Sequence, residues 1–200
     1  MKPSSNTYTI TATDDDGICQ SQTPGAAGNL TLNGALIAGI PTAQHVTVYG
    51  GSNESGKTFT IYGIDQGGQA ISEILTGPNA GTVTSVLNYK TVTRVAVSAA
   101  TTGAIKVGVV ATLETPWVPL DIHVPQFNVG YQVDITTATF ELQGTLDSVQ
   151  DPTITPLENT LVASGTIDIA GNITGPVAAI RLKVSSWTSG TITFKIIQVG

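Results

Sequence analysis

The chain has 200 residues and a formal net charge of −6, and only 11% of its residues are charged. Binding to nucleic acid or to an anionic membrane draws on clustered cationic side chains. The eight Lys and Arg residues are scattered along the sequence, so we expect neither partner. The single cysteine, Cys19, excludes an intrachain disulfide. No apolar run approaches the ~20 residues of a membrane-spanning helix. The N-terminus carries no apolar signal segment, so we expect synthesis in the cytoplasm.

The composition predicts an all-β protein. Thr, Val and Ile are abundant, and branching at Cβ favours strands over helices. The 22 Gly and 10 Pro residues recur between short alternating runs, which is typical of a β-sandwich or jelly roll. We therefore expect two small β domains in tandem, residues 1–115 and residues 116–200.

The first predicted domain, residues 1–115, contains about eight strands. The polar segment Met1–Asn6 is typical of an arm that becomes ordered on a neighbouring subunit. Turns are predicted at Asp14–Gly17, at Asn33-Gly34 and at Asp65–Gly68. Alternation of apolar and polar residues predicts strands at Thr7–Thr13, Asn29–Leu32, His45–Tyr49, Thr58–Tyr62, Gln69–Leu75, Thr82–Leu87, Thr91–Ser98 and Ile105–Val110.

Three prolines, Pro116, Pro119 and Pro125, predict a linker or crossover into the second domain, because proline blocks ladder hydrogen bonds. A polar loop is predicted at Leu146–Asn159. The predicted strands of the second domain are Gln132–Ile135, Thr139–Gly144, Leu161–Ile169, Val177–Val184 and Thr191–Val199.

Each predicted domain must bury one face of its strands. Burial of each apolar side chain contributes roughly 1.5–3 kcal/mol, which leaves a small domain little margin, so association would add stability. The inward-facing candidates are Val46, Val48, Phe59, Ile61, Val95 and Val97 in the first domain, and Phe140, Leu142, Ile180, Leu182, Val184, Phe194 and Ile196 in the second.

The segment Gly51–Thr58 fits the phosphate-loop pattern G-x-x-x-x-G-K-[ST] in full. That chemistry needs a helix that begins at Lys57, because the free N–H groups of the helix bind phosphate. The residues that follow, Thr58–Tyr62, alternate and predict a strand instead. We therefore interpret the motif as a polar hairpin loop rather than a nucleotide site.

The acidic and metal-ligating residues form no recognisable site. Asp14–Gly17 lacks the spacing of a calcium loop, and a solvated turn is the favoured interpretation. His45 and His123 lack partners at ligand spacing, and Cys19 has no adjacent histidine to activate it.

Glu141 with Asp147, or Asp147 with Asp151, could form a carboxylate pair, and the sequence leaves their separations open. We predict no catalytic, cofactor-binding or metal-binding residue, and no enzymatic activity.

Trp117, Tyr131 and Trp187 leave two interpretations open. Aromatic rings stack on sugars, so the three could form a glycan-binding groove. In a chain with only 6% aromatic residues, anchoring in a core or an interface is the favoured interpretation.

Two stretches that cover most of the chain resemble segments of tailed-phage virion structural proteins. The first resemblance is carried by Ala27–Gly34, Val46–Val48, Asn53–Asp65, Gly77–Gly81 and Lys90–Val92. The second is carried by Gly144–Asp147, Pro176–Leu182 and Ile197-Gln198.

This resemblance implies a capsid decoration, or cement, protein. Such a protein is a β-sandwich or jelly roll that sits on the capsid surface as a homodimer or homotrimer and bridges subunits of the major capsid protein, which stabilises the head. No catalytic residue is implied.

Three alternatives remain open from the sequence. The first is a tail or head-to-tail component of the particle. The second is a receptor- or glycan-binding module on a fibre, which predicts an exposed aromatic cluster. The third is an enzyme, for which a helix after Lys57 or a close carboxylate pair would be required.

Overall fold

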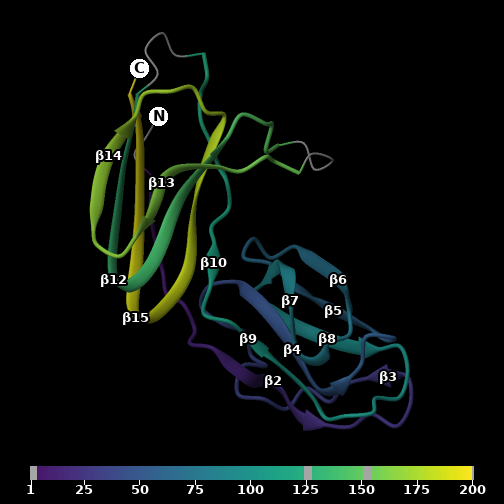
Figure 1. The fold of residues 1–200 in the computed structure, drawn as a ribbon. Helices are drawn as coiled ribbons and strands as arrows, with labels where there is room; N and C mark the ends of the chain where they lie inside the picture. Colours follow the sequence, from purple (N-terminus) through teal and green to yellow (C-terminus); the bar gives the residue numbers. More distant parts are fainter. Residues whose placement is uncertain (1–3, 124–127, 151–154, 200) are drawn as a thin grey trace. The chain divides into compact units, whose positions relative to one another are not determined.

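The computed structural model describes residues 4–123, 128–150 and 155–199. Within these residues the chain forms fifteen β-strands and no helix, which confirms the predicted all-β class (Figure 1). The chain divides into two compact units: unit 1 combines Met1–Ile10 with Thr112–Gly200, and unit 2 is Thr11–Ala111. Unit 2 is therefore an insertion between the first strand of unit 1 and the rest of that unit.

Unit 2 is a sandwich of two four-stranded antiparallel sheets, one ordered β2-β9-β4-β7 and the other β3-β8-β5-β6. The antiparallel pairs nest, since the first strand pairs with the last, the second with the seventh, the third with the sixth and the fourth with the fifth. The strands are β2 (Asp14–Gln22), β3 (Gly28–Asn29), β4 (Gln44–Asn53), β5 (Thr58–Ile64), β6 (Ala70–Thr76), β7 (Asn79–Tyr89), β8 (Thr91–Val97) and β9 (Ile105–Val109).

The space between the two sheets holds the core of unit 2. The predicted inward residues of this unit are all buried, and with Ile18, Ile105 and Tyr89 they form one apolar cluster. The alternation of β4 and β5 is therefore confirmed as the pattern that places one face of each strand in the core.

Three turn and strand predictions near the start of unit 2 are wrong. The strand predicted at Thr7–Thr13 ends at Tyr8, and residues 9–13 are not in a strand. Asp14–Gly17, predicted as a turn, lies in β2, where Asp14 pairs with Val109 of β9 and the register shifts before Cys19. Gly108 of β9 makes this possible, because a Cβ there would lie 1.8 Å from the backbone oxygen of Asp14. The strand predicted at Asn29–Leu32 is shorter, since only Gly28–Asn29 joins the sheet.

Unit 1 is built on one seven-stranded sheet. Its longest strands, β12 and β15, run side by side in Figure 1. The strands are β1 (Ser4–Tyr8), β10 (Leu113–Glu114), β11 (Val118–Pro119), β12 (Asn128–Thr145), β13 (Asn159–Gly165), β14 (Ile169–Ile173) and β15 (Ala179–Val199).

Strands β12 and β15 pair from Asn128↔Val199 to Thr145↔Ala179. Register shifts between Ile135 and Phe140 mark β-bulges, which let two strands bend without ending. On one side of the bulges the sheet continues to β14 and β1, and on the other side to β13, β10 and β11. The prediction of two separate strands in place of each of β12 and β15 is wrong for this reason.

The core of unit 1 contains all its predicted inward residues, with exposed fractions of at most 2%. Two further predictions for this unit need correction. Leu161–Ile169 is split between β13 and β14 rather than forming one strand. Val118–Pro119, predicted as linker, pairs with the edge of β15, whereas Pro125 lies outside the described residues.

The predicted division into residues 1–115 and 116–200 differs from the observed units. The second boundary, between Ala111 and Thr112, lies close to the expected one. The difference is at the N-terminus, where Ser4–Tyr8 forms β1 and pairs with β15 of unit 1. The part of the predicted free arm that the structure describes, residues 4–6, is therefore a strand in this chain.

Candidate functional site

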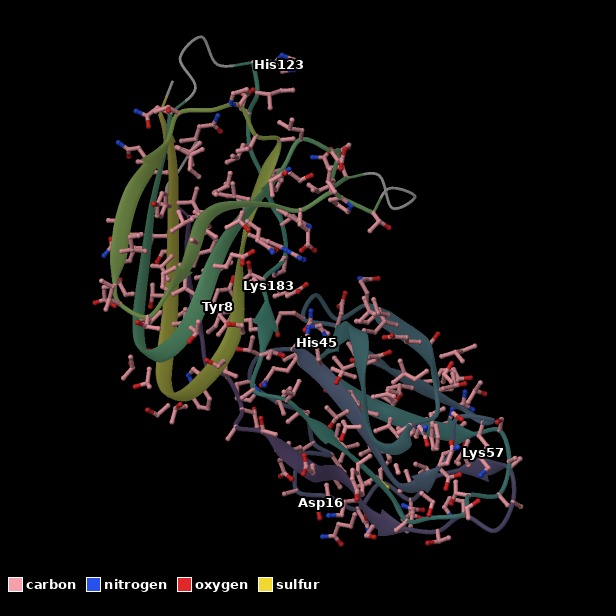
Figure 2. All side chains as sticks on the ribbon, viewed as in Figure 1. Tyr8, Asp16, His45, Lys57, His123 and Lys183 are labelled. Carbon is pink, nitrogen blue, oxygen red and sulfur yellow. The ribbon has the colours of Figure 1, made fainter. Side chains whose placement is uncertain are left out.

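The phosphate-loop motif forms the turn between β4 and β5. Thr58 begins strand β5, so no helix N-terminus is available to hold phosphate. The lysine of the motif, Lys57, forms an ion pair with Glu54 (Figure 2 labels Lys57). The predicted hairpin loop is confirmed, and the geometry excludes the nucleotide-hydrolase arrangement at this motif.

Glu54 is fully buried, and its carboxylate stabilises this loop. Its Oε1 accepts hydrogen bonds from the backbone N–H groups of Thr102 (2.9 Å) and Gly103 (2.7 Å). Burial alone would raise the pKa of Glu54, but the hydrogen bonds from Lys57, Gly103 and Thr102 outweigh it, and the pKa lies below its ordinary value. The carboxylate therefore joins the β4–β5 turn to the loop before β9.

The remaining acidic candidates bind different partners within unit 1. Glu141 accepts hydrogen bonds from Gln143 and Thr160, whereas Asp147 accepts one from the backbone N–H of Leu157 at 2.6 Å. Asp151 lies outside the described residues. The structure thus shows no shared carboxylate site for Glu141 and Asp147.

The histidines and the cysteine do not gather into one site. His45 is in unit 2 and His123 in unit 1 (Figure 2). Burial raises the pKa of the Cys19 thiol, against hydrogen bonds that lower it, which makes the thiol a poor nucleophile. In the part of the chain that the structure describes, no three His, Cys, Asp or Glu side chains are placed to hold a metal ion.

The three aromatic candidates lie at three places along β15. Trp117 stacks on the guanidinium of Arg181 at 4.7 Å, Tyr131 pairs with Ile196, and Trp187 pairs with Ala138. Positions 181, 187 and 196 are six or more residues apart, which is roughly 20 Å or more along a strand. The structure therefore does not form the single aromatic cluster that a glycan groove would require.

A charged cluster in unit 1 escaped the sequence analysis. Arg181 is only 8% exposed, yet its guanidinium binds the carboxylates of Glu114 (2.9 Å) and Glu158, and it donates from Nε to Gln143 at 2.9 Å. Lys183 lies 3.3 Å from Glu114 as well. Because Glu114 and Glu158 are far from Arg181 in sequence, no local spacing could have predicted the cluster.

The Arg181 cluster is internally satisfied. The guanidinium has an acceptor in three directions and the Trp117 ring against it, so it presents no open position to a ligand. We interpret the cluster as a structural connection of β10, β15 and the segment before β13.

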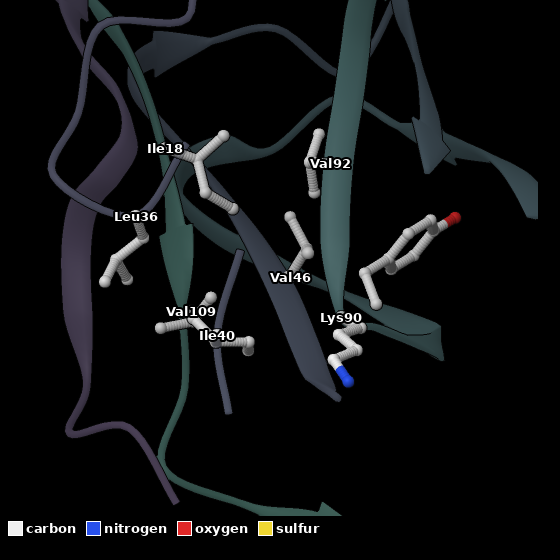
Figure 3. Close-up of a pocket in the computed structure, with 8 residues that line it drawn as sticks. Ile18, Leu36, Ile40, Val46, Lys90, Val92 and Val109 are labelled. Carbon is white, nitrogen blue, oxygen red and sulfur yellow. The ribbon is translucent and has the colours of Figure 1, made fainter. Parts of the chain in front are cut away.

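A small cavity in the core of unit 2 is drawn in Figure 3. Its volume is about 10 Å³, the space of about one water molecule. It is lined by Ile18, Leu36, Ile40, Val46, Tyr89, Lys90, Val92 and Val109. A cavity of this size does not accommodate an organic substrate.

Unit 2 exposes apolar side chains where two of its edge strands, β6 and β7, meet. Ile74 of β6 is 69% exposed, and Val86 and Leu87 of β7 are 79% and 38% exposed. We call these three residues the edge surface. Strands β6 and β7 belong to different sheets but contact each other at this side of the sandwich.

Two residues of the edge surface, Val86 and Leu87, lie in a bulge of β7. Three residues, Ser85–Leu87, stand opposite Val46 alone, because His45 pairs with Asn88 and Thr47 with Thr84. Ser85 Oγ accepts from the N–H of Val46 at 2.8 Å and donates to the carbonyl of Leu87 at 2.7 Å.

The carboxylate of Glu73 on β6 completes the bulge. It accepts the backbone N–H groups of Val86 (2.9 Å) and Leu87 (3.0 Å). These two N–H groups therefore have an acceptor within the unit and are not open to pairing with a further strand. We therefore expect contact with another protein at Val86 and Leu87 to be made by their side chains.

Comparison of the chain with protein-family models, with curated proteins and with solved structures found no match to any of them. Among the described residues, no helix is long and apolar enough to cross a membrane.

Proposed function

We propose that this chain is a decoration subunit of a tailed-phage capsid, which binds the major capsid protein on the outer surface of the virion and stabilises the head. The observation that carries the proposal is the edge surface, where Glu73 and Ser85 hold Val86 and Leu87 exposed in a fixed conformation. Rigidly displayed apolar side chains gain contact area on binding at a low entropic cost.

The all-β architecture supports the proposal at a coarser level. The nested strand pairs of unit 2 are those of one long two-stranded ribbon rolled into two sheets, which is the arrangement expected of a jelly roll. We take the assignment to a capsid from the resemblance inferred from the sequence alone, since the comparisons with known proteins found no match.

We propose no catalytic role. The charged side chains that sequence reasoning singled out as chemistry, Lys57, Glu141 and Asp147, are engaged in internal ion pairs or hydrogen bonds. With two β units of limited core, the chain would add stability by association, so a homodimer or homotrimer belongs to the proposal.

The test is light scattering on the purified chain, followed by co-sedimentation with phage heads assembled without it. A dimer or trimer that pellets with heads, in a fixed ratio to the major capsid protein, is the expected result. Binding to purified tails but not to heads would replace the decoration assignment by a tail component. A monomer that binds neither would overturn the proposal.

A further inference from the structure

Strand β1 lies at an edge of the sheet of unit 1. It pairs antiparallel with the C-terminal half of β15 over five residue pairs, from Ser4↔Ile196 to Tyr8↔Ile192, and the other side of this half of β15 is bonded to β12. If β1 were released, the N–H and C=O groups of β15 that it now pairs would become a template for an incoming strand.

The attachment of β1 depends mainly on its backbone. The side chains of Ser5, Asn6 and Thr7 are exposed, and the hydroxyl of Thr7 lies 3.1 Å from that of Thr193. Tyr8, labelled in Figure 2, is half-buried and hydrogen-bonds to Thr115. Residues 4–8 of any other copy of the chain supply the same groups to β15 with the same geometry.

The residues after β1 are anchored in unit 2. The side-chain amide of Gln44, which is fully buried, accepts the N–H of Thr11 at 2.6 Å and donates to the carbonyl of Thr11 at 2.9 Å. A change of backbone direction between Tyr8 and Thr11 would move β1 away from its own β15 and leave the hydrogen bonds between Gln44 and Thr11 in place.

We propose that β1 is an exchangeable strand, which pairs with β15 of a second copy of the chain when copies are held close together. In dilute solution β1 pairs with β15 of the same copy. The short chain segment that joins β1 to the rest of that copy gives β1 an effective concentration in the millimolar range near this strand. Exchange creates no new contact, so it is a low-cost route to association. The inference depends on the β1–β15 ladder and is independent of the proposed function.

Two single-cysteine variants test the exchange, each in a Cys19→Ala background. One carries Thr7→Cys and the other Thr193→Cys, two positions that are directly opposed in the ladder and suit a disulfide. The chain that carries both Thr7→Cys and Thr193→Cys reports the pairing within one copy. The matched control for the mixture replaces the Thr7→Cys variant by Ser5→Cys, because Ser5 is two residues out of register with Thr193. A heterodisulfide that forms in higher yield than in the out-of-register control reports β1 of one copy lying on β15 of another.

We expect the doubly substituted chain to close within itself at micromolar concentration. In the mixture of single variants the heterodisulfide should form, and its yield should rise roughly in proportion to protein concentration up to the millimolar range. A double variant that closes while the mixture yields no heterodisulfide at any concentration would overturn the proposal. Equal yields from the out-of-register control would overturn it too, since random collision would then explain the crosslink.

Discussion

The two units stabilise a buried charge in different ways. In unit 2 the carboxylate of Glu54 is bound by two backbone N–H groups and one lysine, all supplied by loops. In unit 1 the guanidinium of Arg181 is bound by side chains alone, two carboxylates, one amide and an indole ring. The stabilisation of a charge by backbone groups depends on the conformation of the loops that carry them. The stabilisation of a charge by side chains depends on the residue type of each partner.

The difference also follows from the sheets. Unit 2 encloses its core between two separate sheets, so its loops carry the connections between them. Unit 1 is one sheet that continues through the bulges of β12 and β15, and its strands bring Arg181 and Glu114 together directly. The comparison predicts that a substitution of Glu54 lowers the stability of unit 2 alone and a substitution of Arg181 lowers that of unit 1 alone.

The largest effect is expected for Arg181→Met. Loss of the buried cation leaves Glu114 and Glu158 facing each other, which should destabilise unit 1 by about 3 kcal/mol. Both tryptophans of the chain are in unit 1, so urea unfolding followed by tryptophan fluorescence reports on this unit. Lys183→Met is the control: it contacts the same carboxylates from a more exposed position and should cost less than about 1 kcal/mol. Equal losses in the two variants would refute a special role for Arg181.

The next effect is expected for Glu54→Gln. The amide cannot satisfy both N–H groups and Lys57, so unit 2 should lose about 2 kcal/mol. Circular dichroism should show the shifted transition, and the tryptophan transition of unit 1 should stay in place. Ser55→Ala in the same loop should change stability by less than about 0.5 kcal/mol. A shifted tryptophan transition would show that the two units do not respond separately.

Acid should reproduce the loss at Glu54. The pKa of this group is lower in the folded chain than the ordinary 4.5, so its contribution is complete above pH 4.5 and is lost as the pH falls through the lower folded value. Urea midpoints of unit 2, measured from pH 7 to pH 3, should fall less steeply below pH 4.5 in Glu54→Gln than in the native chain. Parallel curves would exclude Glu54 as the source.

A smaller effect is expected for Glu73→Ala. The N–H groups of Val86 and Leu87 lose their acceptor but can turn to water, so unit 2 should lose about 1 kcal/mol. Amide hydrogen exchange should accelerate at Val86 and Leu87 and stay unchanged at Val83, which is paired with Val48. Unchanged protection at the two bulge residues would show that Glu73 does not hold the bulge.

Period-two alternation was sufficient to predict most strands and the core, because a strand with one buried face must alternate. Phe59 and Ile61, like Leu182 and Val184, are buried as their patterns predict. The sequence also distinguished the Gly51–Thr58 loop from a phosphate site, since the strand character of Thr58–Tyr62 is local.

What the sequence could not predict depends on long-range pairing. The sequence of Ser4–Tyr8 is that of a polar terminus, and the segment is a strand only because it pairs with β15. The sequence pattern at the bulges near Ile135 is the same as that at the end of a strand, because both interrupt the alternation of apolar and polar residues. Arg181 and Val86 have roles set by partners distant in sequence, Glu158 and Glu73 respectively.

The central claim is that the edge surface binds the capsid while the charged clusters serve the fold. Co-sedimentation of Val86→Asp with phage heads tests it most directly. Ile37→Asp is the matched control, since Ile37 is a 45% exposed apolar residue elsewhere on unit 2 and receives the same charge. We predict that Val86→Asp, with the thermal stability of the native chain, loses at least about tenfold in affinity, as expected for an interface hot spot, while Ile37→Asp binds as the native chain does. Native binding by Val86→Asp, or equal losses in both variants, would contradict the account.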